Sequence, residues 1–339
     1  MMKKIIALLL ALMMAVGMLA GCAKQNDDTD DTTDKLRIVT TIFPEYDWVK
    51  EILGDKADHA DITMLLDNGV DLHSYQPTAD DIVKISDCDL FLYVGGESEG
   101  WVEDALKNAT NKDRKVINLL DVLGDSVKSE EVVEGMQEEE HEHEEGEAHE
   151  DGEAHEHEHE EESDEHVWLS LKNAEVLVGA ISNALQELDA ENKDIYAANA
   201  DAYMKKLSAL GAEYQMAVDN ASRKTVLFGD RFPFRYLVDD YGLNYYAAFV
   251  GCSAETEASF ETISFLAKKV DELKLPCVLT IEGKNHKIAE TIVKNTAQKS
   301  QRILTMDSMQ STTSKDVASG TTYLSVMEKN LAVLKEALA

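Results

Sequence analysis

The sequence predicts an α/β protein of two lobes, each a mainly parallel sheet with flanking helices, bridged by one long helix. Three observations support this fold class. Short apolar segments alternate with helical patterns in the first third of the chain, and the alternation returns in the last third. Such alternation is typical of parallel sheets that are covered on both faces. Between these regions, residues 193–218 carry an apolar face at helical spacing, which indicates the bridging helix.

The N-terminal lobe is expected to span residues 35–136. Its strands are expected at 36–42, 60–66, 89–94 and 115–119. Its helices are expected at 45–53, 78–86 and 101–107. Thr78 is a suitable N-cap for the second of these helices, and two aspartates follow in its first turn.

The middle of the chain changes character. Residues 138–165 are mostly Glu and His and cannot form a core, so a mobile loop is expected over 137–165. A helical segment is expected over 166–220, with its first helix at 171–188 and the bridging helix after it.

The C-terminal lobe is expected to span residues 221–339. Its strands are expected at 225–228, 245–250, 277–281 and 302–306. Its helices are expected at 234–240, 259–272, 287–296 and 323–338.

The N-terminus has the pattern of a secretory signal peptide over residues 1–21, with two lysines before an uncharged apolar run. The run ends in Leu-Ala-Gly-Cys, which resembles a bacterial lipobox with Cys22 as the lipidated residue. The alternative is an ordinary signal peptide with a chance cysteine. Residues 22–34 are polar and are expected to form a flexible tether. The lipobox predicts an extracytoplasmic protein held at the bacterial cell membrane by its lipid.

Charge and cysteine content exclude several classes of protein. The net charge is −34, and residues 129–165 contribute 20 acidic residues without a lysine or arginine. Nucleic acids are therefore not expected partners. Cys88, Cys252 and Cys277 form no CxxC pair, which argues against a structural zinc–thiolate site. A disulfide between Cys252 and Cys277 and buried free thiols are both compatible with the sequence.

Histidines are the strongest functional signal, because seven of the ten lie between residues 141 and 166. A mixture of imidazole and carboxylate suits zinc and similar metals. A loop without fixed geometry would bind several ions weakly, and the alternative is a merely acidic, solubilising insertion. The predicted accessory ligands are His141, His143, His149, His155, His157 and His159.

A tight metal site needs ligands on ordered elements. His73 follows the second predicted strand, His166 stands where the His/Glu segment ends, and Asp307 follows the last predicted strand. Ligands of open α/β folds gather beyond the carboxyl ends of strands. These three residues are therefore the predicted ligands.

Several motifs resemble one known family. Segments 71–77 (Asp-Leu-His-Ser-Tyr-Gln-Pro) and 166–170 (His-Val-Trp-Leu-Ser) are its most specific matches, and Tyr236 with 241–243 and the final helix add to them. The chain resembles the zinc/manganese substrate-binding proteins of ABC transporters, the cluster A-I or periplasmic zinc-uptake family. The resemblance implies a metal held between two lobes, with His73, His166 and Asp307 as ligands. It also implies Zn²⁺ as cargo (Mn²⁺ or another divalent metal being the alternative), an ABC transporter permease as partner, and a monomer.

One family ligand has no counterpart here. Members have His or Glu five residues before the tyrosine that corresponds to Tyr236, and this chain has Arg231, which cannot bind a cation. Asp230, a loop histidine such as His159, or water could replace it, and Arg231 could pair with Asp230 or Asp307.

The predicted function is capture of zinc and its delivery to an ABC importer, without enzymatic activity. The alternatives are a secreted zinc-dependent hydrolase and a surface adhesin lipoprotein. The chain contains neither an HExxH nor a GxSxG motif, which disfavours the hydrolase.

Overall fold

The computed structural model describes residues 35–107, 109–137, 162–253, 257–283 and 285–339. The predicted signal peptide, Cys22 with its tether, and the six accessory histidines lie outside the described residues. Residues 36–339 form one compact unit. A search of the described residues finds no helix that is both long and apolar enough to cross a bilayer.

The first sheet lies in the N-terminal lobe, and all of its strand pairs are parallel. Its order is β2-β1-β3-β4, with bounds Leu36–Thr40 (β1), Ala60–Met64 (β2), Leu90–Tyr93 (β3) and Lys115–Asn118 (β4). The helices of this lobe are Phe43–Leu53 (α2), Ala79–Asp87 (α3), Val102–Lys107 (α4) and Leu119–Leu123 (α5). Thr78 caps α3 and exchanges hydrogen bonds with Asp81, as its sequence position predicts.

The second sheet repeats the plan in the C-terminal lobe, again with parallel pairs. Its order is β6-β5-β7-β8, with bounds Thr225–Phe232 (β5), Asn244–Val250 (β6), Cys277–Thr280 (β7) and Arg302–Thr305 (β8). The helices of this lobe are Arg235–Tyr241 (α8), Phe260–Leu273 (α9) and Lys287–Asn295 (α10). The short helix Ser314–Ala318 (α11) follows β8 along the chain, and its first backbone N–H donates to the carbonyl oxygen of Asp67 in the N-terminal lobe at 2.8 Å. Two parallel four-stranded sheets with flanking helices confirm the predicted fold class.

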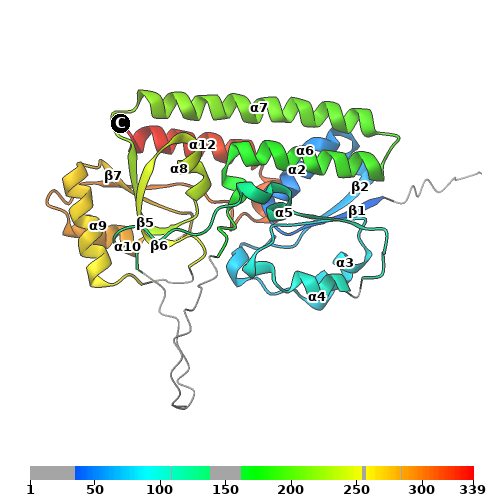
Figure 1. Cartoon of the computed structure of the whole chain (residues 1–339), viewed down its shortest axis with the longest axis horizontal. Coiled ribbons are helices and arrows are strands. Elements are labelled where there is room, and N and C mark those ends of the chain that lie inside the picture. The colour runs from blue at the N-terminus through cyan, green and yellow to red at the C-terminus, as the bar shows by residue number, and fades with distance from the viewer. Residues whose placement is uncertain (1–34, 108, 138–161, 254–256, 284) are drawn as a thin grey trace, which may run out of the picture. The chain divides into compact units, whose positions relative to one another are not determined.

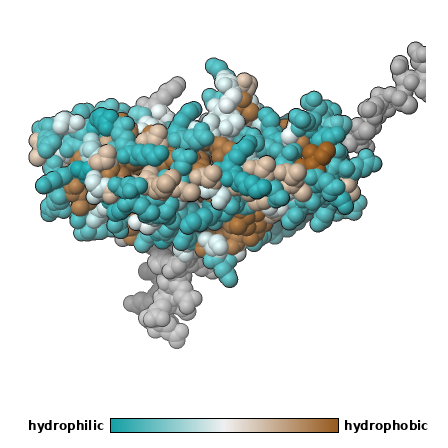
Figure 2. Space-filling view, turned by 90° about the horizontal axis from the view of Figure 1, so that it is seen from above, coloured by the Kyte–Doolittle hydropathy of each residue, from teal (hydrophilic) through white to brown (hydrophobic). Residues whose placement is uncertain are grey.

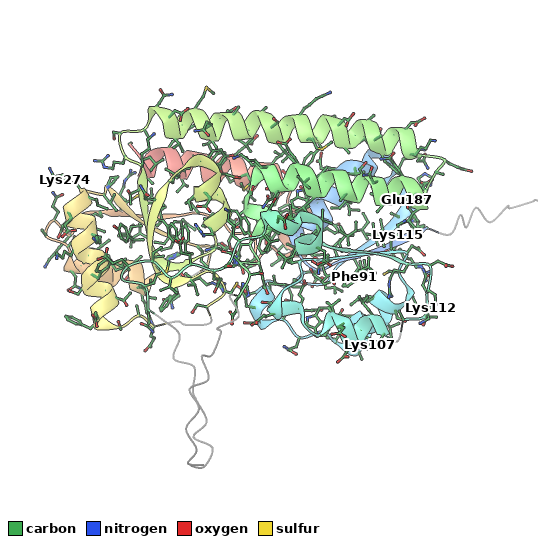
Figure 3. All side chains as sticks on the ribbon, viewed as in Figure 1. Phe91, Lys107, Lys112, Lys115, Glu187 and Lys274 are labelled. Atoms are coloured by element: carbon green, nitrogen blue, oxygen red, sulfur yellow. The ribbon has the colours of Figure 1, made fainter. Side chains whose placement is uncertain are left out.

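Three long helices lie beside the sheets: Leu171–Leu188 (α6), Lys193–Asn220 (α7) and Tyr323–Ala337 (α12). Helix α7 contacts α6 and α2 along one part of its length and α12 and α8 along another, so it bridges the lobes as predicted (Figure 1). Its buried face has the predicted helical spacing and is made of Tyr196, Ala200, Tyr203, Leu207, Leu210, Tyr214 and Val218. The side chains of Lys115 in β4 and Glu187 in α6 form an ion pair that joins the first sheet to this helical layer (Figure 3).

The outer face of α7 is polar. Figure 2 looks onto the side of the molecule that carries α7, where hydrophilic residues dominate and hydrophobic ones occur in separate patches. Ile195 and Met216 are the large apolar side chains that α7 exposes. This polarity is the expected complement of a helix that buries only one stripe.

One hydrophobic core runs through both lobes, and a smaller one lies under α9 and α10. Buried hydroxyl groups join α12 to the turn at Trp168 and α7 to α12. The Tyr323 hydroxyl donates to the carbonyl oxygen of Trp168 (2.7 Å), and the Tyr214 hydroxyl donates to that of Met327 (2.6 Å). These bonds satisfy polar groups that would otherwise be costly to bury.

The segment 127–137 lies against the second sheet, although it follows the first sheet in sequence. The backbone N–H of Gln137 donates to the carbonyl oxygen of Ala248 in β6 (3.0 Å), and Ser129 pairs with Ser163 in an isolated antiparallel bridge. The segment therefore brings the start of the predicted His/Glu loop and the residues before His166 together beside β6.

Glu45 and Glu99 are among the carboxyl groups that the N-terminal lobe buries. Glu45 accepts hydrogen bonds from the backbone N–H groups of Thr41 and Ile42, and Glu99 accepts one from Gly95. One oxygen of each carboxyl group has no partner. Burial raises the pKa of Glu99 to about 7 and that of Glu45 well above its usual range.

Replacing Glu99 by Gln is expected to change how stability depends on pH. A carboxyl group whose pKa is raised by folding costs nothing below the unfolded-state pKa, and its cost grows until the pH passes the folded-state pKa. In the wild type this cost appears between pH 4.5, the usual pKa of a glutamate side chain, and about pH 7. Between these pH values, the free energy of unfolding of the variant should therefore rise relative to that of the wild type by up to roughly 3 kcal/mol.

Urea unfolding at pH 4.5 and pH 8 measures the difference. Glu103→Gln on α4 is the matched control, because Glu103 is exposed. A Glu99→Gln variant whose stability followed that of the wild type at both pH values would contradict the expectation.

Candidate metal centre

His73 lies in a short 3-10 turn, Leu72–Ser74, that follows β2 along the chain. The Asp71 carboxylate starts this turn and accepts the backbone N–H of His73 at 3.0 Å. The His73 ring is almost buried, and its Nδ1 lies 2.7 Å from the Ser98 hydroxyl and 3.4 Å from a Glu165 oxygen. Its Nδ1 is therefore engaged by the N-terminal lobe, and its Nε2 faces the space between the lobes.

His166 is fully buried and is held by the carboxylate two residues before it. Asp164 Oδ1 lies 2.9 Å from both the backbone nitrogen and the ring Nδ1 of His166. An ionised carboxylate can only accept hydrogen bonds, so Nδ1 carries the hydrogen and Nε2 keeps a free lone pair. A carboxylate behind a histidine is the arrangement that orients metal-binding imidazoles.

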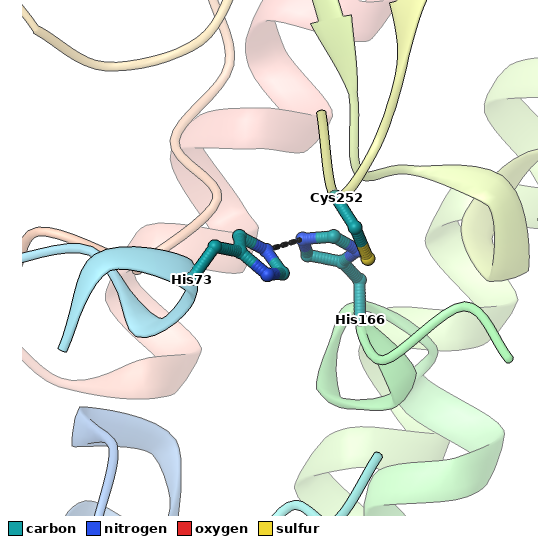
Figure 4. Close-up of side chains that lie close together, drawn as sticks. All are labelled: His73, His166 and Cys252. Carbon is teal, nitrogen blue, oxygen red and sulfur yellow. Dashed lines mark hydrogen bonds between the residues drawn. The ribbon is translucent and has the colours of Figure 1, made fainter. Parts of the chain in front are cut away.

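The two rings meet through their Nε2 atoms, which are 3.2 Å apart (Figure 4). Two imidazoles on a tetrahedral zinc ion would hold these atoms about 3.3 Å apart, given Zn–N bonds near 2.05 Å. The pair is therefore already spaced to bind one ion. Burial and the neighbouring His166 ring lower the pKa of His73 to about 3, which leaves this ring neutral at neutral pH.

Cys252 supplies a third donor. Its Sγ and one nitrogen from each of His73 and His166 all lie within 4.8 Å of one another. Figure 4 shows the three side chains converging from three separate segments. Gly251 makes the approach feasible, because a Cβ there would lie 2.9 Å from the His166 Cε1 atom.

The environment of Cys252 is acidic. The Glu130 carboxylate accepts the backbone N–H of Cys252 at 2.8 Å. Burial raises the pKa of the thiol well above its usual range, and the charges of Glu130 and Asp164 add to this shift. An incoming cation would therefore displace a proton from sulfur as it binds.

The sequence prediction did not include Cys252 as a ligand. One signal was available, because Cys252 follows strand β6 just as His73 and Asp307 follow other strands. The disulfide that the sequence left open is absent: Cys88, Cys252 and Cys277 are free thiols, and the first and last are buried.

Asp307 and Asp230 lie outside this group of three donors. Asp307 Oδ1 accepts the backbone N–H of Met309 (2.8 Å), and burial together with Glu282 raises the pKa of Asp307 to about 6. Asp230 lies inside β5, where its carboxylate accepts the backbone N–H groups of Arg231 (3.0 Å) and Ile281 (3.3 Å). The structure therefore brings His73 and His166 together, and it turns both aspartates toward backbone of their own lobe.

Arg231 also lies within β5, after a register shift, and not at the start of a helix. Its guanidinium forms an ion pair with Asp71, the residue that starts the His73 turn. The expected pairing of the Arg231 side chain with Asp230 or Asp307 was wrong. The backbone extends as a strand past the predicted end, and the long side chain reaches the opposite lobe.

Comparison with known proteins gives consistent matches. The ZnuA family, described as "Zinc-uptake complex component A periplasmic", matches residues 38–337. The zinc-binding lipoprotein AdcA of Streptococcus pneumoniae serotype 4 is 33% identical over 335 residues, which cover 99% of this chain and 61% of that protein. The high-affinity zinc uptake system protein ZnuA of Bacillus subtilis (strain 168) is 31% identical over 318 residues, which cover 94% of this chain and 92% of that protein.

Solved structures agree with the sequence matches. The Zn(II)-bound ZnuA-like domain of Streptococcus pneumoniae AdcA superposes with a TM-score of 0.67 at 29% identity, covering 90% of this chain and 99% of that domain. The chain thus spans less than two thirds of the full streptococcal protein and nearly the whole of its ZnuA-like domain.

Proposed function

Because the chain belongs to the ZnuA family of zinc-uptake components, we propose that it captures one zinc ion between its lobes and delivers it to an ABC importer. The single observation that carries this proposal is the pair of Nε2 atoms, set 3.2 Å apart on two lobe segments with a thiol beside them. The family is one of substrate-binding proteins and not of enzymes. Family membership therefore disfavours the alternative of a secreted zinc-dependent hydrolase.

The proposed ligands are His73, His166 and Cys252, with Asp307 as the carboxylate that completes the tetrahedron. Asp307 follows β8, and ligands of open α/β folds gather beyond the carboxyl ends of strands, which supports its assignment. Asp230 is placed outside the ligand set, because two backbone N–H groups already engage its carboxylate. Two imidazoles and a thiolate favour Zn²⁺ over Mn²⁺, which prefers oxygen ligands.

The remaining parts of the proposal concern segments outside the described residues. We propose that Cys22 is lipidated and anchors the protein on the extracytoplasmic side of the membrane, next to its permease. A relative with 33% identity is named a zinc-binding lipoprotein, which supports this arrangement. Two or more acyl chains would hold such a protein firmly, whereas one would not.

Deleting residues 138–161 is expected to remove several weak zinc sites and leave one tight site. The reason is that the tight site's donors lie on ordered elements, whereas the deleted histidines offer independent imidazoles. Zinc titration calorimetry of the full-length chain and the deletion variant measures both classes of site.

A second variant separates histidine from acidity. Replacing His141, His143, His149, His155, His157 and His159 by glutamine keeps the acidic charge and should also abolish the weak sites. Loss of the tight site on deletion would mean that a histidine of this segment, such as His159, is a ligand. Absence of any tight site in the wild type would refute the proposed function.

A further inference from the structure

We infer that Arg231 is a positioning residue: its ion pair with Asp71 joins the two lobes and holds the His73 turn in the metal-binding position. This inference rests on the proposed function, because it assigns a role within the same site. Arg231 stands where family members have a metal ligand, and the inference assigns it a role other than coordination.

The ion pair has an uncommon place in the fold. Arg231 lies in β5 of the second sheet, and Asp71 lies in the loop after β2 of the first sheet, 160 residues away in sequence. Among the ion pairs of the described residues, only this one joins residues 35–126 to residues 221–339. Both side chains are mostly buried, with 17% and 22% exposure, so their attraction is less screened than that of a surface pair.

The two oxygens of Asp71 have different partners. Oδ2 receives the Arg231 guanidinium, whereas Oδ1 receives the backbone N–H of His73 at 3.0 Å and lies 4.0 Å from His73 Nε2. Because the two oxygens belong to one planar carboxylate, an ion pair at Oδ2 also restrains the position of Oδ1. Arg231 therefore restrains the backbone of His73 from the opposite lobe, through a single intermediate residue.

The charges of the pair also suit a cation site. An isolated arginine beside the site would repel a divalent ion, and a free Asp71 would be within reach of that ion. As an ion pair, the two side chains carry no net charge. The Asp71 carboxylate remains the acceptor for the backbone N–H of His73. Removing either partner leaves a half-buried charge without compensation.

The test is a cycle of Arg231→Gln, Asp71→Asn and the double variant, measured by zinc affinity. Each single change is expected to weaken zinc binding about 10–100-fold, the usual cost of losing a partner that orients a ligand. The double variant is expected to lose little more, because the two side chains act as one unit. The swapped pair, Asp71→Arg with Arg231→Asp, restores an ion pair but offers no acceptor to the His73 N–H, so its zinc affinity should stay as low as that of the single variants.

A second readout needs no metal. Hydrogen exchange at the His73 backbone amide should become faster in Arg231→Gln than in the wild type, because the Asp71 acceptor is no longer held. The His166 amide, which Asp164 holds, should be unaffected. Arg37→Gln is the matched control, since its partner Asp89 lies in the same lobe and its loss should change neither readout.

Zinc affinity of the wild type tests the proposed function, whereas exchange of the His73 amide tests the role of Arg231. If the wild type bound no zinc, the proposed function would fail, and the exchange of the His73 amide would still test the ion pair. Unchanged exchange at His73 in Arg231→Gln would overturn the inference, and so would losses of zinc affinity that add fully in the double variant. Tighter zinc binding in Arg231→Gln would show that the arginine acts only by repulsion, and would also overturn it.

Discussion

Replacing His73 or His166 by alanine is expected to lower zinc affinity by more than the roughly 10–100-fold that loss of an orienting partner costs. Each change removes one of the two imidazole nitrogens that lie 3.2 Å apart, so the ion loses a direct ligand and not only a group that orients one. Competition with a fluorescent zinc chelator measures the affinity. His59→Ala is the control, because His59 is exposed and lies outside the centre.

The two variants should differ in stability without metal. His166 is fully buried, and its removal leaves a cavity and deprives Asp164 of its partner. His73 is held at the edge of the N-terminal lobe and should be less costly to remove. Thermal unfolding of the metal-free variants therefore separates loss of a ligand from loss of structure. Tight zinc binding by both folded variants would exclude these histidines as ligands.

Most of the fold could be predicted because its signals are local. Helix α6 has the predicted bounds, 171–188, because Ser170 caps its start and its apolar residues recur at helical spacing. The buried residues of α7 lie within the predicted segment 193–218 for the same reason. Short elements such as α5 and α11 were missed, since five residues carry too little periodicity to be recognised.

The site could be predicted only in part, because its geometry depends on contacts between distant segments. His73 and His166 stood out by their motifs, and the structure places their rings 3.2 Å apart. Cys252 reaches them only because Gly251 lets the end of β6 approach His166 closely. The pair of Arg231 and Asp71 depends on the extension of β5 beyond its predicted end, which a register shift allows. Neither feature has a local signature.

Cys252→Ser and Asp307→Ala are expected to have unequal effects on zinc affinity. The serine variant should bind zinc at least about 100-fold more weakly, because a thiolate is a strong zinc ligand and a neutral hydroxyl is a poor substitute. The alanine variant should lose about tenfold or less, because water can take the fourth position of a zinc ion that keeps three protein ligands.

Cobalt(II) reports the ligand atoms directly. The wild type should show a sulfur-to-cobalt charge-transfer band that Asp307→Ala retains and Cys252→Ser loses. Cys252→Asp offers a carboxylate in the same place and should shift the preference from zinc toward manganese, since oxygen ligands suit the harder ion. Equal losses for Cys252→Ser and Asp307→Ala would overturn this ranking of the two ligands. A Cys252→Ser variant with unchanged affinity would remove sulfur from the centre.

Cys252 is expected to matter more than Asp307 because it needs less rearrangement to reach the ion. Asp307 must give up the hydrogen bond from the backbone N–H of Met309, and it lies outside the group of three donors. The Cys252 sulfur already lies within 4.8 Å of a nitrogen of each imidazole, its backbone is anchored to Glu130 at 2.8 Å, and the cation displaces the proton that the thiol retains. Cys252 therefore needs less rearrangement than Asp307 to reach the ion, and its loss should cost more.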